Sequence, residues 1–202
     1  MTDRNIEEPR QPVSPTRMVR AGLLFYAVVM AAALVWRVGF YGESILFASA
    51  LDEARGVRWL VDIGWGLGAG GGLVVVSFLA VHGTRWGREM AAELASALGP
   101  IGLPNAVLLA FASGLAEEMF FRGALQPRVG LVAASLLFAA LHFLPRRVLL
   151  PWTAFALVAG LLFGGLFQWT GNLIAPVIAH VVVNAVNLPF LERRFGQAAG
   201  EF

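Results

Sequence analysis

Residues 101–121 read IGLPNAVLLAFASGLAEEMFF, an apolar run that charge interrupts only near its end. A helix needs about 20 apolar residues to cross the hydrocarbon core of a bilayer, so this run has the length of a transmembrane helix. Similar apolar runs lie on both sides of it, at residues 21–36, 60–82, 131–144, 149–169 and 172–190. We therefore predict an all-α fold, a polytopic transmembrane helical bundle of about six spans.

The composition agrees with a membrane protein. Hydrophobic residues make up 58% of the 202-residue chain and charged residues only 14%, whereas a soluble domain carries about 25% charged residues. The chain has no cysteine, which excludes disulfides, thiolate nucleophiles and cysteine-based zinc sites. Its net charge of +2 comes without a basic stripe of interleaved aromatic residues, so we expect no nucleic-acid partner.

The polarity of the chain divides it into four regions. We predict a disordered polar tail at 1–16, N-terminal transmembrane helices with their loops at 17–100, a core at 101–190 and a C-terminal tail at 191–202. Two mixed segments of the second region read as connections outside the membrane. Residues 37–59 form a loop with an interfacial helix, and residues 83–100 form a partly amphipathic connection.

The arginines predict the orientation. All 15 basic residues are arginine. If the N-terminus is cytoplasmic, ten of them fall on the cytoplasmic side: Arg4, Arg10, Arg17, Arg20, Arg85, Arg88, Arg146, Arg147, Arg193 and Arg194. Because cytoplasmic loops are rich in Arg and Lys, this count favours both termini in the cytoplasm.

A run of glycines lies in the second span, at Gly64, Gly66, Gly68, Gly70, Gly71 and Gly72. It lacks the Lys-Ser/Thr ending and the preceding strand of a phosphate-binding loop. Small residues also let membrane helices approach closely, and this is the interpretation we adopt. Gly160 and Gly164 have the same small-xxx-small spacing.

Two adjacent carboxylates, Glu117 and Glu118, stand at the end of the third span. Each costs about 2.5–3.5 kcal/mol inside a membrane, so the fold must compensate them. Glu118 and Arg122 are four residues apart on one helix face and can form an ion pair. Glu117 points elsewhere and is free to act as a base. Alternatively, the two carboxylates mark the aqueous end of the helix.

Further polar side chains lie in two later spans. Phe138 and His142 are one turn apart in the fourth span, and His180 and Asn184 share a face of the sixth. If the third helix turns back near residues 127–130, Glu117 and His142 reach a similar depth. However, Pro145-Arg146-Arg147 follows His142 closely and pulls that end toward an interface, so the side on which a site opens is unsettled.

These residues resemble the three ordered motifs of the CAAX-protease and bacteriocin-processing family (CPBP, or Abi), which includes the Ras-converting CAAX endopeptidase of eukaryotic membranes. The motifs are Glu117-Glu118-xxx-Arg122, Phe138-xxx-His142 and His180-xxx-Asn184. The resemblance covers residues 101–190, which would make them the catalytic core, and we recognise no family for residues 1–100.

The resemblance implies an intramembrane endopeptidase. By similarity, Glu117 would activate a water for attack on the scissile carbonyl, and His142 and His180 would orient that water or shuttle its proton. Asn184 would donate a hydrogen bond to the developing oxyanion. Glu118 and Arg122 would be a supporting pair, and Phe138 a packing or substrate-contact residue.

The cofactor is left open by the sequence. Glu117, His142 and His180 would be the ligand set of a three-ligand catalytic zinc site. The chain has no HExxH motif, and the same three residues serve equally well in a metal-free mechanism with a glutamate-activated water. We favour the metal-free mechanism.

Two other functions are alternatives to an intramembrane endopeptidase. A component of a proton-coupled transporter also carries intramembrane Glu and His, but this chain shows no internal repeat and its ionisable spans lie in one half. A non-catalytic membrane immunity or assembly protein would not need every motif position filled.

We expect an integral protein of a bacterial inner membrane whose substrate is a membrane-anchored or hydrophobic-tailed protein or peptide. Some bacterial relatives resemble sorting enzymes of the myxosortase type.

Overall fold

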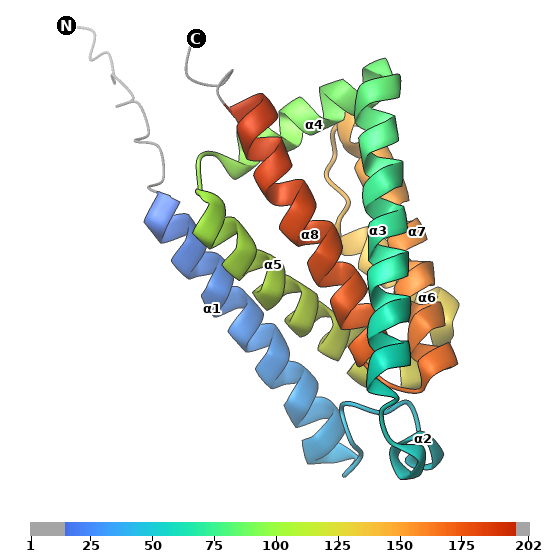
Figure 1. Cartoon of the computed structure of the whole chain (residues 1–202). Coiled ribbons are helices and arrows are strands. Elements are labelled where there is room, and N and C mark those ends of the chain that lie inside the picture. Colours follow the sequence, from blue (N-terminus) through green and yellow to red (C-terminus); the bar gives the residue numbers. More distant parts are fainter. Residues whose placement is uncertain (1–14, 197–202) are drawn as a thin grey trace, which may run out of the picture.

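The computed structural model describes residues 15–196, and within them the secondary structure is helical except for one isolated bridge between Phe47 and Asn172 (Figure 1). The predicted all-α fold is therefore confirmed. The helices are α1 (Pro15–Leu34), α2 (Ala50–Arg55), α3 (Trp59–Gly83), α4 (Arg85–Leu98), α5 (Leu103–Glu118), α6 (Gln126–Leu141), α7 (Leu150–Thr170) and α8 (Ile174–Phe195). Short segments of other helical type extend α1, α5 and α7: η1 (Val35–Phe40), η2 (Met119–Leu125) and η3 (Arg147–Leu149).

Most of the predicted N-terminal tail (residues 1–14) and half of the predicted C-terminal tail (residues 197–202) lie outside the described residues. The parts that are described are helical, because α1 begins at Pro15 and α8 runs on to Phe195. The two predicted connections contain the short helix α2 and the amphipathic helix α4, as expected.

Within residues 15–196, five segments are long and apolar enough to cross a membrane, where the sequence predicted about six spans. They are Thr16–Phe40, Trp59–Gly83, Leu103–Leu141, Arg147–Thr170 and Ile174–Phe195. The third contains two of the expected spans, because its helices join at a kink at Gly130, whose φ of 83° is open to glycine at low cost. The helix after the kink ends at Leu141 and is only about 16 Å long, half the thickness of the hydrocarbon core.

The glycines that pack helices together are a subset of those noted in the sequence. A Cβ atom on Gly66 would lie 2.7 Å from the carbonyl oxygen of Ala175, and one on Gly70 would lie 2.8 Å from that of Ala179. These two glycines therefore let α3 approach the backbone of α8, as small residues do in membrane proteins. Gly68, by contrast, has open space where a Cβ would be.

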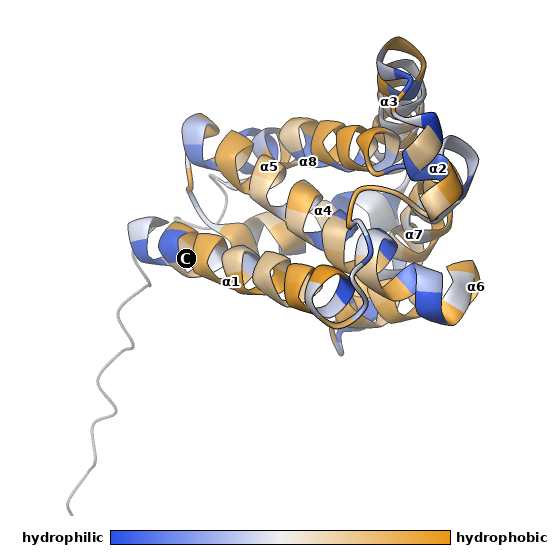
Figure 2. Cartoon of the chain, turned by 90° about the horizontal axis from the view of Figure 1, so that it is seen from below, coloured by the Kyte–Doolittle hydropathy of each residue, from blue (hydrophilic) through white to orange (hydrophobic). Residues whose placement is uncertain are grey.

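The helices are hydrophobic along most of their length, and hydrophilic residues occur mainly near helix ends and in the connections (Figure 2). Leu24, Phe25 and Leu60 are 67%, 60% and 89% exposed. Exposure of this kind suits a lipid environment, in which apolar side chains can face the hydrocarbon while every backbone polar group is satisfied within the protein. The protein is thus an integral membrane protein.

The start of α1 and the end of α8 lie at the same end of the bundle, which α4 crosses, whereas α2 lies at the opposite end (Figure 1). We call these the α4 end and the α2 end. Eight described arginines lie on the segments at the α4 end: Arg17, Arg20, Arg85, Arg88, Arg146, Arg147, Arg193 and Arg194. Four lie at the α2 end: Arg37, Arg55, Arg58 and Arg128.

Candidate active site

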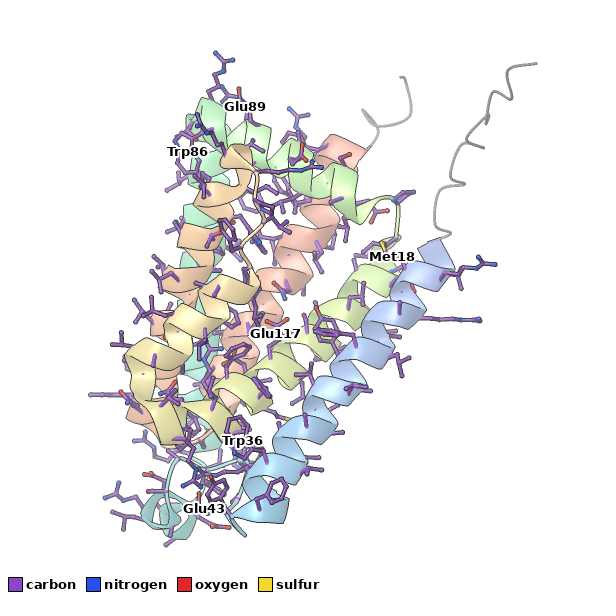
Figure 3. All side chains as sticks on the ribbon, turned by 180° about the vertical axis from the view of Figure 1, so that it is seen from behind. Met18, Trp36, Glu43, Trp86, Glu89 and Glu117 are labelled. Atoms are coloured by element: carbon purple, nitrogen blue, oxygen red, sulfur yellow. The ribbon has the colours of Figure 1, made fainter. Side chains whose placement is uncertain are left out.

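One cavity of about 290 Å³ brings together most of the side chains singled out in the sequence. Glu117 from α5, Phe138 and His142 at the end of α6, and His180 and Asn184 from α8 all line it. Glu117 lies about midway between the two ends of the bundle (Figure 3). The sequence explains why Glu117 and His142 lie at a similar depth. Glu117 precedes the kink at Gly130 by 13 residues, and His142 follows it by 12.

The arginines that follow His142 placed it near one membrane interface in the sequence-based prediction, but it lies deeper in the bundle. Helix α6 ends at Leu141, and residues 143–146 continue without helix toward the α4 end. A non-helical chain advances up to about 3.3 Å per residue, roughly twice as far as a helix. Arg146 therefore reaches an ion pair with Glu93 of α4, while His142 stays in the interior beside Glu117.

The predicted pair of Glu118 and Arg122 is present and completely buried. Their side chains are 0% and 1% exposed, and Nη1 of Arg122 donates to Oε1 of Glu118 over 2.8 Å. Nη2 of the same guanidinium donates to the carbonyl oxygen of Gly160 on α7, over 3.0 Å. The guanidinium carbon also lies 4.6 Å from the centre of the Phe138 ring. These contacts compensate the buried arginine charge.

Glu118 has a second partner that the sequence did not predict. Its Oε1 lies 2.8 Å from Nδ1 of His180. A carboxylate oxygen accepts, so Nδ1 of His180 carries the proton and Nε2 of the neutral ring is an acceptor. The ring also stacks on Phe163, with centroids 5.1 Å apart and 24° between the planes. His180 is therefore fixed in both tautomer and orientation.

Glu117 and His142 form the more accessible half of the site, with side chains 14% and 21% exposed. Oε2 of Glu117 lies 3.8 Å from Nε2 of His142, and this carboxylate oxygen is buried without a hydrogen-bond partner among the described residues. Nδ1 of His142 donates to the carbonyl oxygen of Phe138 over 2.8 Å. Nε2 of the neutral ring is thus an acceptor facing Glu117, at a separation that one bridging oxygen atom can span.

Asn184 is linked to α5 through Ser113. Its Nδ2 donates to Oγ of Ser113 over 2.9 Å, and Oγ in turn donates to the carbonyl oxygen of Ala110 over 3.2 Å. This uses one of the two amide hydrogens of Asn184, and the other is available to a ligand in the cavity.

The sequence reasoning missed three further polar residues that line the cavity: Tyr26, Ser113 and Asn187. Two of them carried a local signal. Ser113 lies one turn before Glu117, and Asn187 lies three residues after Asn184 on the same face of α8. Tyr26 had only the weaker signal of a lone phenol in the apolar first span.

The positions of Glu117, His142 and His180 bear on whether these side chains could bind one metal ion. Among residues 15–196, no three His, Asp or Glu side chains form a group that could hold a metal ion. Nδ1 of His180 is engaged by Glu118 and Nδ1 of His142 by a backbone carbonyl, which leaves Nε2 of each ring as the nitrogen that could bind a metal or a water. As these side chains lie, Glu117, His142 and His180 do not form such a group, and the mechanism below is derived without a metal.

Comparison with known proteins supports the resemblance seen in the motifs. Residues 99–186 match the family model of type II CAAX prenyl endopeptidase Rce1-like proteins. The chain is also 45% identical over 86 residues to the uncharacterized protein YpbD of Bacillus subtilis (strain 168). That match covers 42% of this chain and 44% of the relative, so the chain spans less than half of the length of the relative. No solved structure matches the chain.

Proposed function

Residues 99–186 belong to the type II CAAX prenyl endopeptidase Rce1-like family, and from this premise we propose that the protein is an intramembrane endopeptidase. It cleaves a peptide bond in a membrane-anchored or hydrophobic-tailed protein or peptide. One observation carries the proposal: the unpartnered Oε2 of Glu117 and the acceptor Nε2 of His142 face each other across 3.8 Å in a cavity midway along the bundle.

Glu117 acts as the general base. A water that lies between Glu117 and His142 gives a proton to the carboxylate as its oxygen attacks the scissile carbonyl carbon. The C–O bond forms, the carbonyl becomes an oxyanion, and the free amide hydrogen of Asn184 donates to it. The proton then passes to the amide nitrogen, the C–N bond breaks, and the products are a carboxylic acid and an amine.

His180 lies on the other wall of the cavity, held by the buried Glu118–Arg122 pair. With Nδ1 bound to Glu118, its Nε2 is an acceptor for the water or for the leaving amine. The pair acts through His180, since neither Glu118 nor Arg122 is among the residues that line the cavity.

An adjoining cavity supports a hydrophobic substrate. It also measures about 290 Å³, lies between α3, α4, α7 and α8, and shares Trp152, Phe155, Asn187 and Leu191 with the site. The side chains that line it are apolar apart from Ser77 and Asn187, and these two are hydrogen-bonded to each other over 3.0 Å. Large apolar residues near the scissile bond would be bound there through burial of apolar surface.

The site cavity extends toward the α4 end of the bundle, where Met18, Leu98 and Leu191 line it. This is the end that carries the larger number of arginines, so the positive-inside rule makes it cytoplasmic. We therefore infer that the peptide bond reaches Glu117 from the cytoplasmic side of a bacterial inner membrane. Both ends of the described chain would face the cytoplasm.

The test is cleavage by the purified full-length protein in lipid nanodiscs. Quenched fluorescent peptides with hydrophobic C-terminal tails serve as substrates, and mass spectrometry identifies the products. Loss of a general base costs about 10²–10⁴-fold in rate, so Glu117→Gln should abolish measurable cleavage. The control is Glu89→Gln, which removes an exposed carboxylate on α4 and should leave the rate unchanged. Equal rates for Glu117→Gln and the wild type, or no cleavage of any such peptide, would overturn the proposal.

A further inference from the structure

Helix α1 lies outside the segment that matches the family, residues 99–186, yet it forms part of the site wall. Met18, Gly22 and Tyr26 of α1 line the same cavity as Glu117. These positions are four residues apart and so share one helix face. A Cβ atom on Gly22 would lie 3.2 Å from the Leu109 side chain of α5, so the glycine keeps the two helices close at this point.

Tyr26 brings a hydroxyl to the reaction centre. Its side chain lines the cavity together with Glu117 and Ser113, both on α5, and these two are the polar side chains that act electrostatically on its hydroxyl. A tyrosine inside an apolar span needs a partner for its hydroxyl, and phenylalanine would serve if packing were its only role. The neighbouring Phe25 is 60% exposed on the outside of the bundle, where lipid is the expected contact. The polar side chains that share the cavity with the hydroxyl of Tyr26 include the candidate base.

Residues of three helices meet at the site. Asn184 on α8 donates to Ser113 on α5, and Tyr26 on α1 lines the same cavity as Ser113 and Glu117. A carboxylate that accepts a hydrogen bond at one oxygen is fixed in rotation about its last side-chain bond. This matters here, because Oε2 of Glu117 otherwise has no protein partner to orient it.

We propose that Tyr26 is a positioning residue for the general base: its hydroxyl donates to Glu117 and holds the unpartnered Oε2 toward His142. The inference rests on the proposed function. It gives α1, which no family motif includes, a specific part in catalysis. It also couples Glu117 to Asn184, so that base and oxyanion donor are held in one geometry before substrate binds.

Kinetics of Tyr26→Phe in nanodiscs test the role. The substitution keeps the ring and removes only the hydroxyl, so the structural change is small. A mispositioned base slows the chemical step without weakening binding, and we expect kcat to fall about tenfold while KM stays within about twofold. The matched control is Tyr41→Phe, at the only other tyrosine of the chain, which should leave both constants unchanged. A fall in kcat of less than about threefold, or a loss expressed in KM, would overturn the role.

Fluorine NMR tests the contact without any need for activity. The chain has two tyrosines, so 3-fluorotyrosine labelling of the full-length protein gives two signals, and Tyr41→Phe assigns them. Glu117→Gln should move the Tyr26 signal and leave that of Tyr41 in place. Glu43→Gln should do the reverse, because Glu43 pairs with Arg128, whose guanidinium carbon lies 3.7 Å from the Tyr41 ring centre.

The two measurements separate the possible failures. A Tyr26 signal that Glu117→Gln leaves unmoved would refute the contact and the inference with it. An active wild type whose kcat survives Tyr26→Phe would refute the positioning role and leave the proposed function intact. A wild type that cleaves no peptide would overturn the proposed function and the catalytic role of Tyr26 together, even if the NMR contact is present.

Discussion

Nδ1 of His180 lies 2.8 Å from Oε1 of Glu118, although 62 residues separate the two in the sequence. The same oxygen accepts from Nη1 of Arg122. One carboxylate therefore neutralises a buried arginine and also fixes the tautomer of a histidine in the candidate site. In metal sites, mutation of a partner that orients a histidine in this way typically costs about 10–100-fold in metal affinity or activity.

We predict that Glu118→Gln lowers kcat about 10–100-fold, the range seen when the partner of a functional histidine is lost. The glutamine amide can donate to His180 as well as accept, so the ring is no longer held in one tautomer. Peptide cleavage in nanodiscs measures the effect, and Glu117→Gln should be the slower variant of the two. A Glu118→Gln enzyme as fast as the wild type would contradict the orienting role.

Arg122→Met should destabilise the protein by about 3–5 kcal/mol, because it leaves the buried Glu118 carboxylate without its cation. Thermal unfolding in detergent measures the loss. Arg85→Met is the control, since it breaks an exposed pair with Glu89 that is worth about 0–1 kcal/mol. Stability should be partly restored in the Glu118→Gln/Arg122→Met double variant. Equal effects of Arg122→Met and Arg85→Met would show that the buried pair is not structurally important.

Gly70→Ala should lower the unfolding temperature, because the added methyl group would lie 2.8 Å from the carbonyl oxygen of Ala179 and push α3 away from α8. Such overpacking costs about 1–3 kcal/mol. Gly68→Ala, two residues away, meets open space and should be neutral or stabilising by up to about 1 kcal/mol, since alanine is the better helix former. The opposite ranking of the two variants would be inconsistent with the close approach of the helices.

Low pH should weaken the ion pair between Glu43, in the loop at the α2 end, and Arg128 of α6. The hydrogen bond from Arg128 holds the pKa of Glu43 below its usual range, aided by the charges of Arg37 and Arg128 and opposed by desolvation. A carboxyl group whose pKa is lowered by folding stabilises the fold above its unfolded pKa, and this contribution is lost as the pH falls through the folded value. The unfolding temperatures of wild type and Glu43→Gln should therefore converge below about pH 4. A difference between the two unfolding temperatures that stays constant down to about pH 2 would argue against this effect of Glu43 protonation.

Chelators should leave peptide cleavage unchanged, because Glu117, His142 and His180 are not arranged as a metal-binding group. Dialysis of the purified protein against EDTA and 1,10-phenanthroline, followed by elemental analysis and the nanodisc assay, measures this. Loss of activity that added zinc restores would show that the three side chains rearrange around an ion, and the mechanism would then need revision.

The local features of the fold and site were predictable from the sequence. The apolar runs fixed the helical bundle, because span length depends only on neighbouring residues and on bilayer thickness. The pairing of Glu118 with Arg122 followed from helix geometry, since residues four apart share a face. The candidate site residues stood out in the sequence because ionisable groups are rare and costly inside a membrane.

The remaining features depend on contacts between helices that are distant in the chain. The half-length helix that ends at Leu141 placed His142 deeper than its neighbouring arginines indicated. No local pattern could show that Glu118 binds His180, or that Tyr26 of the first helix lines the same cavity as Glu117. The sequence by itself determined which elements form and which charges need compensation, because both are local costs. Only the tertiary structure decided which partner supplies that compensation, because the choice depends on how the helices pack against one another.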